Sequence, residues 1–556
     1  MIGWLSVALG APWLVGVETG AADLDRDGDG RVDGTDAAYV CYRSSRVCVV
    51  DGHVPREALL GLDGLRHVER DRPMQVQQGT VLTDCPATDA VDEVGYELTR
   101  IGVLSGAHGG AWDVGKGAGA TVAVQDAGFR TSHVELDGRV VRGWDYGDND
   151  GRPEVSPAAV PEHGTFVAGI VSAVEDGSGR VGVAPEAELF LQKIADSTGA
   201  LYFSYAIAAM DDLVLTAPEV KVVDYSIAAT DPPRAFEDAV AGLATADILL
   251  VTAAANCTVP SCGNADNDVD PIFPASYSLV MDHVVAVSSQ RPDGTLDPYS
   301  HYGLTSVALG APGADVCSLA VTSDTAFSRA SGTSYAAPVV AGVAALARQA
   351  FPRLTAGQTE QLLCATANAA ELVGQVRCGS VDADRALHAA WLDEVSGEGI
   401  DDVVDMEVGV ERTVELTVEN LAGEEEVVVA VEAAGILTEP STVVLAADGP
   451  TTVSLSVFTG IEGSFEGNVT VTGCCSSVSA PWSAEATGEP AGTDTGTPTD
   501  TGAPTDTDTD DPTTDPATEE PAPSAEEEEK GGCGCTQGSR WSLSPWLARR
   551  RVPRGR

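Results

Sequence analysis

The sequence predicts an α/β domain with a doubly wound, mostly parallel sheet, followed by a β-sandwich domain and a disordered stalk. Three observations lead to this prediction. Between residues 94 and 392, apolar runs of strand length alternate with helical patterns, as in parallel sheets covered by helices on both faces. Residues 398–490 alternate apolar and polar positions without a helical segment, which is typical of a sandwich. Residues 491–529 are almost only Thr, Asp, Pro, Gly, Glu, Ala and Ser, a composition that cannot build a packed core.

Composition limits the classes of partner. The chain has 556 residues, and 43% of them are hydrophobic, which is enough for several domains with substantial cores. It carries 84 acidic against 32 basic residues, a formal net charge of −52. Nucleic acids and anionic lipid surfaces attract basic faces, so we expect no nucleic-acid partner and no adsorption to such membranes. No stretch reaches the roughly 18–20 apolar residues that a membrane-spanning helix needs.

The N-terminal region carries two signals. Residues 1–22 contain an apolar run that ends near small residues, and this pattern resembles a secretory signal. Residues 23–38 then place oxygen ligands at the spacing of an EF-hand loop, with a glycine at its sixth position. The six ligand positions are Asp25, Asp27, Asp29, Arg31 (through its carbonyl), Asp33 and Asp36. The sequence therefore predicts a structural calcium ion here, and the alternative is an acidic solvated turn.

Residues 39–77 predict a small strand–helix–strand unit, and the cysteines begin here. Three pairs lie close in sequence: Cys41 and Cys48, Cys257 and Cys262, and Cys364 and Cys378. Short-range pairs in a long chain favour disulfides and an oxidising compartment. Zinc binding is the alternative, although no CxxC is matched by a second CxxC or by an HxxxH.

The α/β region supplies its strands and helices in alternation. Continuous apolar stretches predict strands at residues 121–126, 189–194, 221–227, 248–254 and 284–289. Helical patterns occupy residues 164–175, 203–215, 234–246 and the run that follows Ser334. In an open parallel sheet, sites form at the carboxyl ends of the strands, so polar residues at those positions are candidates for chemistry.

Three polar residues stand at the ends of such elements. Asp126 closes the first strand, His163 opens the helix that follows, and Ser334 opens the long apolar helix near the end of the domain. A serine hydroxyl is a weak nucleophile that a histidine in contact can activate, and a carboxylate on the other imidazole nitrogen orients that histidine. Each residue alone could be structural, as a helix cap or a turn residue. Together they have the order Asp, His, Ser that subtilisins share.

On these motifs, residues 94–392 resemble a subtilisin-like serine protease domain. The segment VTAAAN aligns Asn256 with the family's oxyanion asparagine, and VVDYSIAA aligns Ser226, Ile227 and Ala228 with the edge strand that pairs with substrate. Ala228 and Ala255 stand where the family usually has glycines. The resemblance therefore implies a pocket narrowed by two methyl groups, next to Asn256, for the side chain before the scissile bond.

The resemblance has further implications outside the triad. Residues 39–77 are similar to a short inhibitory propeptide, with the mature chain starting between about residues 78 and 98. Glu135 matches a position that often serves a bound calcium ion. Residues 530–556, with Cys533 and Cys535 before an apolar patch and a run of arginines, resemble a myxobacterial-type C-terminal sorting signal. The alternative for this tail is a metal-binding or merely basic segment.

The sequence thus predicts a secreted or surface-anchored serine endopeptidase that is made as a precursor. It would hydrolyse polypeptides with Asp126, His163, Ser334 and Asn256, and no cofactor is required for that chemistry. Two alternatives remain: a catalytically inactive subtilisin-like binding domain, and a calcium-dependent surface adhesion protein whose active part is the β-domain.

Overall fold

The computed structural model describes most of the chain between residues 11 and 488. The described residues are 11–18, 39–50, 54, 56–60, 64–74, 80–82, 85, 95–155, 163–257, 265–400, 402–423, 425–438, 440–446, 449–459, 461–473 and 475–488. The predicted calcium loop with Asp25–Asp36, the predicted stalk (491–529) and the predicted sorting tail (530–556) lie outside them.

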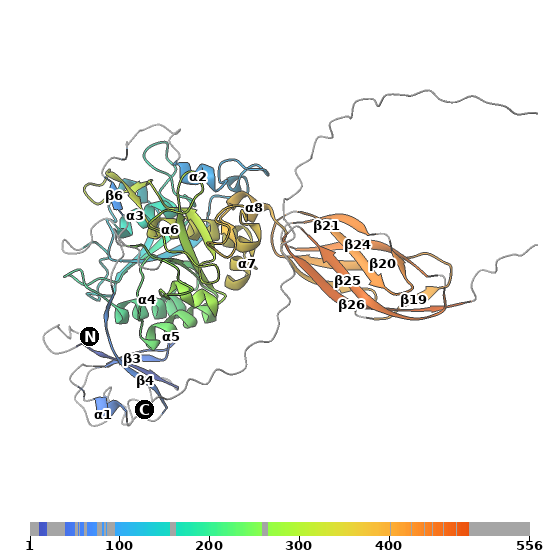
Figure 1. Ribbon diagram of the computed structural model, residues 1–556, viewed down its shortest axis with the longest axis horizontal. Coiled ribbons are helices and arrows are strands. Elements are labelled where there is room, and N and C mark those ends of the chain that lie inside the picture. Colours follow the sequence, from blue (N-terminus) through green and yellow to red (C-terminus); the bar gives the residue numbers. More distant parts are fainter. Residues whose placement is uncertain are drawn as a thin grey trace, which may run out of the picture.

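An eight-stranded sheet forms the centre of the α/β domain (Figure 1). Its strand order is β17–β14–β13–β12–β11–β7–β9–β8, and all neighbouring strands run parallel. The strands are β7 (Thr121–Asp126), β8 (Val140–Asp145), β9 (Glu188–Lys193), β11 (Val220–Tyr225), β12 (Leu249–Ala253), β13 (Val284–Gln290), β14 (Leu309–Pro312) and β17 (Gly379–Ser380). The predicted parallel sheet is confirmed, and its central strands are buried throughout because helices cover both faces.

Two helix pairs cover the sheet. Helices α3 (His163–Ser172) and α6 (Thr333–Ala350) pack on one face, and α4 (Phe203–Thr216) and α5 (Arg234–Leu243) pack on the other. Helix α6 is Ala- and Val-rich and almost entirely buried, as expected of a helix that is apolar all round. The remaining helices of the domain are short or peripheral: α2 (Tyr96–Arg100), α7 (Ala356–Thr366) and α8 (Ala383–His388).

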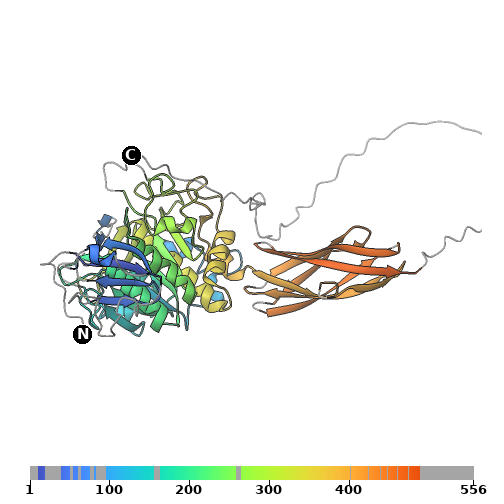
Figure 2. The same cartoon turned by 90° about the horizontal axis from the view of Figure 1, so that it is seen from below.

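A second, four-stranded antiparallel sheet lies at the N-terminus and packs on α4 and α5 (Figure 2). Its order is β2–β3–β1–β4, and the short α1 (Arg56–Leu59) lies between β3 and β4 in the chain. The strands are β1 (Trp13–Val17), β2 (Tyr39–Tyr42), β3 (Val47–Val50) and β4 (Leu65–Arg70).

The position of β1 bears on the predicted leader over residues 1–22. Trp13–Val17 is buried along its whole length and pairs with β3 on one side and β4 on the other. Removal of residues 1–22 would therefore take a central strand out of this sheet. The apolar residues Trp13–Val17, which lie within the predicted secretory signal, thus form a buried strand of this sheet.

Two further segments tie the N-terminal region to the α/β domain. Strand β5 (Pro73–Met74) pairs antiparallel with β10 (Leu201–Tyr202). Strand β6 (Thr80–Leu82) adds to the hairpin of β15 (Val316–Leu319) and β16 (Phe327–Ser331). A disulfide joins Cys85, just after β6, to Cys317 in β15.

The disulfide predictions are confirmed where both cysteines are described. Cys41–Cys48 links β2 to β3, and Cys364–Cys378 fastens α7 to the loop before β17. Cys257 is also disulfide-bonded, while Cys262 lies outside the described residues. The Cys85–Cys317 bridge was not predicted, because the two cysteines are 232 residues apart.

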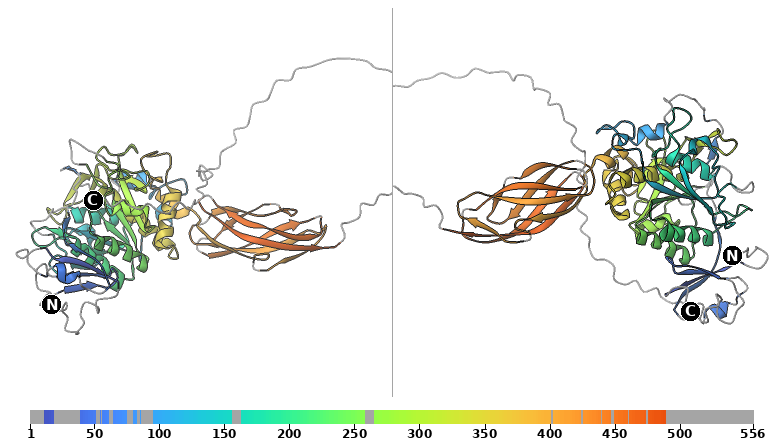
Figure 3. Two further views of the ribbon diagram at one scale, coloured as in Figure 1. Left: turned by 60° about the horizontal axis from the view of Figure 1, so that its bottom comes forward. Right: turned by 180° about the vertical axis from the view of Figure 1, so that it is seen from behind.

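The C-terminal domain is the predicted β-sandwich and lies to one side of the α/β domain (Figure 3). Its two sheets have the orders β18–β20–β24–β22 and β19–β26–β25–β21–β23. The strands are β18 (Leu392–Gly397), β19 (Val404–Glu407), β20 (Arg412–Asn420), β21 (Glu425–Ala433), β22 (Leu437–Thr438), β23 (Ser441–Leu445), β24 (Gly449–Phe458), β25 (Gly463–Thr472) and β26 (Ser477–Thr487). Alternate residues point into a core around Trp482 and Phe465. The domain begins at Leu392, about six residues before the predicted boundary.

No helix in the described part of the chain is both long enough and apolar enough to cross a membrane.

Candidate active site

Asp126 and His163 form a buried pair where β7 ends and α3 begins. The His163 Nδ1 lies 2.7 Å from the Asp126 Oδ2, and both side chains are fully shielded from solvent. The other carboxylate oxygen of Asp126 accepts a hydrogen bond from the backbone N–H of Ala127 at 2.6 Å. A buried carboxylate on Nδ1 places that nitrogen's proton between the two groups and so leaves Nε2 as the basic nitrogen.

The close approach of α3 to β7 depends on Gly164. A Cβ at this position would lie 2.5 Å from the Gly128 carbonyl oxygen and 2.9 Å from the Asp126 Cβ. Both contacts are shorter than carbon and oxygen atoms tolerate, so a larger residue would push His163 away from Asp126.

Ser334 lies in the first turn of α6 and is almost fully buried. Its hydroxyl donates to the backbone carbonyl of Ser226 at 3.1 Å, and the Ser226 hydroxyl lies 3.1 Å from the Ser334 carbonyl. These two contacts join α6 to the end of β11. The His163 Nε2 is buried and has no hydrogen-bond partner among the described residues. Among the described residues, the site therefore holds one buried imidazole nitrogen without a hydrogen-bond partner and one buried serine hydroxyl that donates to a backbone carbonyl.

Asn256 lies just beyond the end of β12 with its amide orientation fixed. Its Oδ1 accepts hydrogen bonds from the Thr333 backbone N–H at 2.8 Å and from the Thr333 hydroxyl at 3.2 Å. Because Oδ1 faces two donors, Nδ2 with its N–H donors is the end that turns away from Thr333.

Ala255 adopts a backbone conformation that side chains disfavour. Its φ is +93° and its side chain is fully buried, in the region where glycine is favoured and other residues are strained. Ala255 packs with Ala228 and Ile272 in a small apolar cluster. The two alanines that were expected to narrow one pocket therefore do lie together.

Ser226, Ile227 and Ala228 continue from the end of β11, but β11 is a central strand. The predicted edge segment therefore lies beyond the end of β11, and its pairing with substrate stays a prediction. Its neighbours β7 and β12 end at about the same level, since Asp224 pairs with Val124 and Tyr225 with Thr252. The backbone thus leaves the sheet here. It next pairs at Ala229, which bridges to Phe273.

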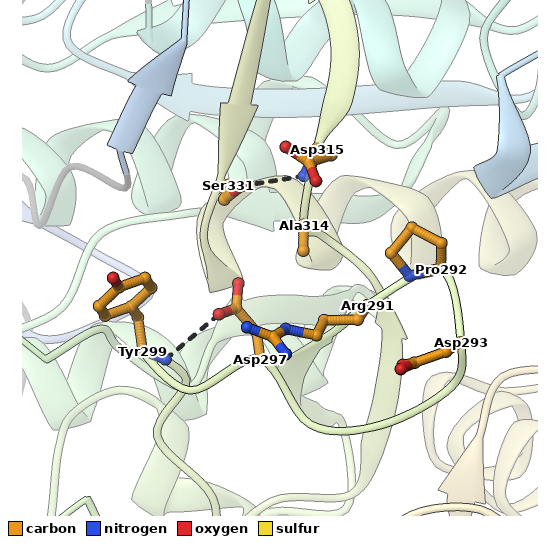
Figure 4. Close-up of a pocket in the computed structure, with 8 residues that line it drawn as sticks. All are labelled: Arg291, Pro292, Asp293, Asp297, Tyr299, Ala314, Asp315 and Ser331. Atoms are coloured by element: carbon orange, nitrogen blue, oxygen red, sulfur yellow. Dashed lines mark hydrogen bonds between the residues drawn. The ribbon is translucent and has the colours of Figure 1, made fainter.

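A cavity of about 530 Å³ opens beside the loop that contains Asn256 (Figure 4). Its lining comprises Arg291, Pro292, Asp293, Asp297, Tyr299, Ala314, Asp315 and Ser331. The cavity adjoins the Asn256 loop, because the Tyr299 carbonyl accepts a hydrogen bond from the Cys257 N–H at 2.8 Å. Three carboxylates and one guanidinium line it.

Two residues near the site were not predicted from the sequence. Thr333 orients Asn256 and could have been found from its position next to Ser334. Asp224 is fully buried two residues before Ser226, and burial together with the nearby Asp126 raises the pKa of its carboxyl well above the ordinary range. An acidic residue at a buried position near the end of a mostly apolar strand was the signal available for Asp224.

Among known proteins, residues 117–393 match the subtilase family, Peptidase S8. Thermitase of Thermoactinomyces vulgaris is 34% identical over 238 residues, which is 42% of this chain and 77% of that protein. An intracellular serine protease of Paenibacillus polymyxa is 31% identical over 240 residues, 43% of this chain and 69% of that protein. A solved protease structure from Pseudoalteromonas arctica is 26% identical and covers 53% of this chain and 93% of its own, with a TM-score of 0.43.

Replacing Ala255 by Gly tests the strain at this position. Glycine adopts positive φ freely, so Ala255→Gly should raise the free energy of unfolding by up to about 1 kcal/mol, with relief of strain opposed by the greater entropy of the unfolded chain. The matched control is Ala254→Gly, one residue earlier, where no positive φ occurs and the same change should destabilise. Urea unfolding measures both, and equal destabilisation by the two variants would contradict the assignment of strain to Ala255.

Proposed function

This chain belongs to the subtilase family, whose members are serine endopeptidases, and we propose that it hydrolyses peptide bonds through Asp126, His163 and Ser334. The observation that carries this proposal is the buried 2.7 Å contact between His163 Nδ1 and Asp126 Oδ2. It leaves the partnerless Nε2 as a base, in a site where Ser334 supplies the hydroxyl. An inactive binding domain would have no need to keep this buried basic nitrogen unpaired.

In the proposed reaction, Ser334 Oγ leaves the Ser226 carbonyl and gives its proton to His163 Nε2 as it attacks the substrate carbonyl carbon. The C–N bond then breaks, and His163 returns that proton to the leaving amine. Water repeats the sequence on the acyl-enzyme and releases the second product. Asp126 stays ionised and stabilises the imidazolium that forms in both halves.

We assign stabilisation of the oxyanion to Asn256 and to the backbone N–H of Ser334. The support is the fixed amide of Asn256, whose oxygen is held by Thr333, so that Nδ2 supplies the donors. Donors aimed in advance at the developing charge need no reorganisation during the reaction, and they act strongly in a site without water.

We propose that substrate binds as an extended polypeptide along Ser226–Ala228 and β10. Strand β10 has β5 as its antiparallel partner, so this segment already accepts an added strand. Met74 in β5 is buried, and its sulfur lies 3.1 Å from the Tyr225 hydroxyl, one residue before Ser226. The cluster of Ala228, Ala255 and Ile272 favours a small or medium apolar side chain before the scissile bond.

The N-terminal sheet is proposed to act as the inhibitory pro-segment predicted for residues 39–77, extended by β1. Its support is the way it completes two helices of the α/β domain. Neither α4 nor α5 has a side-chain cap of its own. Instead Asp71 accepts from the Ser204 N–H at 3.2 Å, and Glu69 accepts from the Arg234 N–H at 2.7 Å. Carboxylates at helix N-termini satisfy free N–H groups and the helix dipole.

Charged contacts strengthen the same interface. Asp238 on α5 lies 2.9 Å from both Arg66 and His67 of β4, and Ser44 donates to Asp211 on α4 through its backbone N–H at 2.7 Å. Strand β5 follows β4 in the chain and pairs antiparallel with β10. The N-terminal sheet therefore binds the two helices, and the segment that follows it covers β10, the strand proposed to bind substrate.

Secretion and surface anchoring are proposed on the basis of the disulfides and the C-terminal sequence. Three bridges in the described residues indicate an oxidising compartment, while residues 530–556 are proposed to be processed and held at the cell surface. Mass spectrometry of the mature termini tests this, since an intact cytosolic chain would rule it out.

Calcium is proposed at Glu135 as well as in the loop Asp25–Asp36. Glu135 is buried, and its Oε2 has no hydrogen-bond partner among the described residues. Burial, and then the charge of Asp176, raise the pKa of Glu135 to about 7. A buried carboxylate without a partner suits a hard cation. No cluster of three or more His, Cys, Asp or Glu side chains that could hold a metal occurs in the described part of the chain, so carbonyl oxygens would complete the coordination.

Ser334→Ala tests the proposed function. Loss of the nucleophile should lower kcat by at least about 10⁴-fold, on the scale known for subtilisins themselves, and should leave the full-length chain uncut if maturation is autocatalytic. The matched control is Ser172→Ala, which removes an equally buried hydroxyl that donates to the Ala187 carbonyl at 2.6 Å. Peptide hydrolysis and gel analysis give the result. Retained hydrolysis in the Ser334 variant would contradict the assignment.

The pro-segment should bind more tightly at acidic pH. Burial raises the pKa of Asp71 to about 6, from about 4 in the unfolded chain. Because the pKa of Asp71 is higher in the folded state, this carboxyl contributes fully to the free energy of unfolding below about pH 4. The contribution is lost as the pH rises through about 6. The free energy of unfolding should fall by about 3 kcal/mol over this pH range through the titration of Asp71.

Urea unfolding of the uncut Ser334→Ala chain measures this dependence. Adding Asp71→Asn should remove the decrease between about pH 4 and 6, whereas the control Asp231→Asn, at an exposed partner of Arg72, should preserve it. Parallel pH curves for the Asp71 variant and its parent would contradict the assignment.

Calcium removal should lower the thermal unfolding temperature of the mature enzyme. Since a proton competes with the cation at Glu135, the stabilisation by calcium should weaken below about pH 7. Glu135→Gln should abolish that part of the calcium-dependent shift, whereas Glu154→Gln, on an exposed loop, should not. An identical shift in both variants would exclude Glu135 as a ligand.

A further inference from the structure

Asp224 is a buried carboxyl that the proposed mechanism does not use. It lies on the central strand β11 and is completely shielded from solvent. Its Oδ1 has no hydrogen-bond partner among the described residues, while its Oδ2 lies 3.0 Å from the Ser226 hydroxyl. A fully buried carboxylate with one neutral partner is costly, so this group needs an explanation.

The Ser226 hydroxyl lies between two oxygen atoms that both need a proton. One is Asp224 Oδ2 at 3.0 Å, and the other is the Ser334 carbonyl at 3.1 Å. A hydroxyl has one proton to donate, so it cannot satisfy both acceptors at once. If Asp224 is protonated, its own O–H donates to Ser226 Oγ, and Ser226 then donates to Ser334. Both contacts are satisfied only in this arrangement.

The surroundings of Asp224 favour the protonated form. Burial is the largest influence on its pKa and raises it well above the ordinary range; the negative charge of Asp126 on β7 acts in the same direction, and the hydrogen bond from Ser226 opposes them. Strand β12 presents Thr252, whose hydroxyl donates to the Tyr225 carbonyl. Helix α6 presents the Ser334 carbonyl, and α3 presents His163, which faces Asp126 rather than Asp224. None of the contacts of Asp224 among the described residues supplies a cation to hold a negative charge.

We propose that Asp224 is a positioning residue that holds a proton and, through Ser226, fixes the backbone of Ser334 at the start of α6. The proposal rests on Ser334 being the nucleophile. Ser334 and Ser226 are joined by two contacts of 3.1 Å, and the second breaks when Ser334 Oγ turns to attack. The contact that Asp224 supports is the one that remains during the reaction. It therefore keeps the Ser334 N–H, a proposed oxyanion donor, in place.

Loss of the Asp224 proton should disturb this arrangement. An ionised Asp224 carboxylate accepts a hydrogen bond from the Ser226 hydroxyl. That hydroxyl then no longer donates to the Ser334 carbonyl. It also adds a second negative charge beside Asp126. Activity should therefore fall at alkaline pH. The fall should appear in kcat more than in KM, because the substrate strand binds by backbone contacts while the displaced group acts on the transition state.

The test compares Asp224→Asn with Asp224→Leu in the full-length chain after maturation. Asparagine keeps a donor for Ser226 but cannot titrate, so it should preserve kcat within about threefold at neutral pH and remove the alkaline decrease. Leucine has a similar size but no donor, and should lower kcat about tenfold with little change in KM. The matched control is Glu97→Gln, another buried carboxyl with its pKa raised to about 7, which should leave the alkaline decrease unchanged.

Infrared spectroscopy tests the proton directly and needs no variant. At about pH 8, one unit above the pKa of Glu97 and Glu135, the wild-type protein should still show the carbonyl band of a buried protonated carboxyl, and Asp224→Asn should lack it. Absence of this band in the wild type would overturn the proposal, as would an unchanged alkaline decrease in Asp224→Asn. Active-site titration with a serine-directed reagent distinguishes failure of the proposed function from failure of the role of Asp224. If no serine is labelled, the proposed function is contradicted. If Ser334 is labelled but the pH profiles of the variants are unaltered, only the role of Asp224 is contradicted.

Discussion

The contact between Asp126 and His163 is the constraint on which the arrangement of the site depends. A charged carboxylate and an imidazole at 2.7 Å, both without solvent access, are stable only when the surroundings hold them in register and satisfy the remaining carboxylate oxygen. The parallel sheet brings the end of β7 beside the start of α3, Gly164 permits the close approach, and the Ala127 N–H occupies the second oxygen. Ser334 then arrives from α6, which packs against α3 on the same face. The end of β7 and the start of α3 therefore hold this buried pair between them.

The N-terminal sheet shows how the same domain depends on a segment that it is proposed to lose. Helices α4 and α5 begin without side-chain caps, and the carboxylates of Asp71 and Glu69 fill that role from outside. Each cap of this kind contributes about 0.5–2 kcal/mol. A pro-segment that completes two helix ends can thus assist folding and also cover β10. The Cys85–Cys317 bridge would keep β6 attached if the chain is cut upstream of Thr80.

Much of the fold followed from local patterns, and the exceptions have physical reasons. Strands such as Thr121–Asp126 were predicted at their observed bounds because parallel, doubly covered strands read as unbroken apolar runs. The short strands β14, β15 and β16 were missed, since four or five residues carry too little periodicity. Strand β1 was assigned to a leader because a buried central strand and a short signal segment have the same apolar composition. The bridge from Cys85 to Cys317 depends on tertiary folding and leaves no trace in spacing.

The sequence predicted the candidate catalytic residues but not the residues that hold them in position. Asp126, His163 and Ser334 were predicted from three motifs in a fixed order and Asn256 from a fourth segment, and their catalytic roles stay predictions. Thr333 and Asp224 were not predicted, because their contacts depend on the tertiary fold. Thr333 orients the Asn256 amide, and Asp224 contacts the Ser226 hydroxyl. The pocket alanines were noted as unusual, yet only the backbone revealed that Ala255 holds a φ of +93°.

The central claim is that Ser334 is a nucleophile activated by the buried His163–Asp126 pair. Reaction of the mature protein with a fluorophosphonate, followed by mass spectrometry of the labelled peptide, measures this most directly. We predict a single modification at Ser334 that appears in parallel with the loss of peptide hydrolysis and that is absent from a His163→Ala variant. A protein that hydrolyses peptides but is labelled at another serine, or that remains unlabelled at Ser334, would contradict the account.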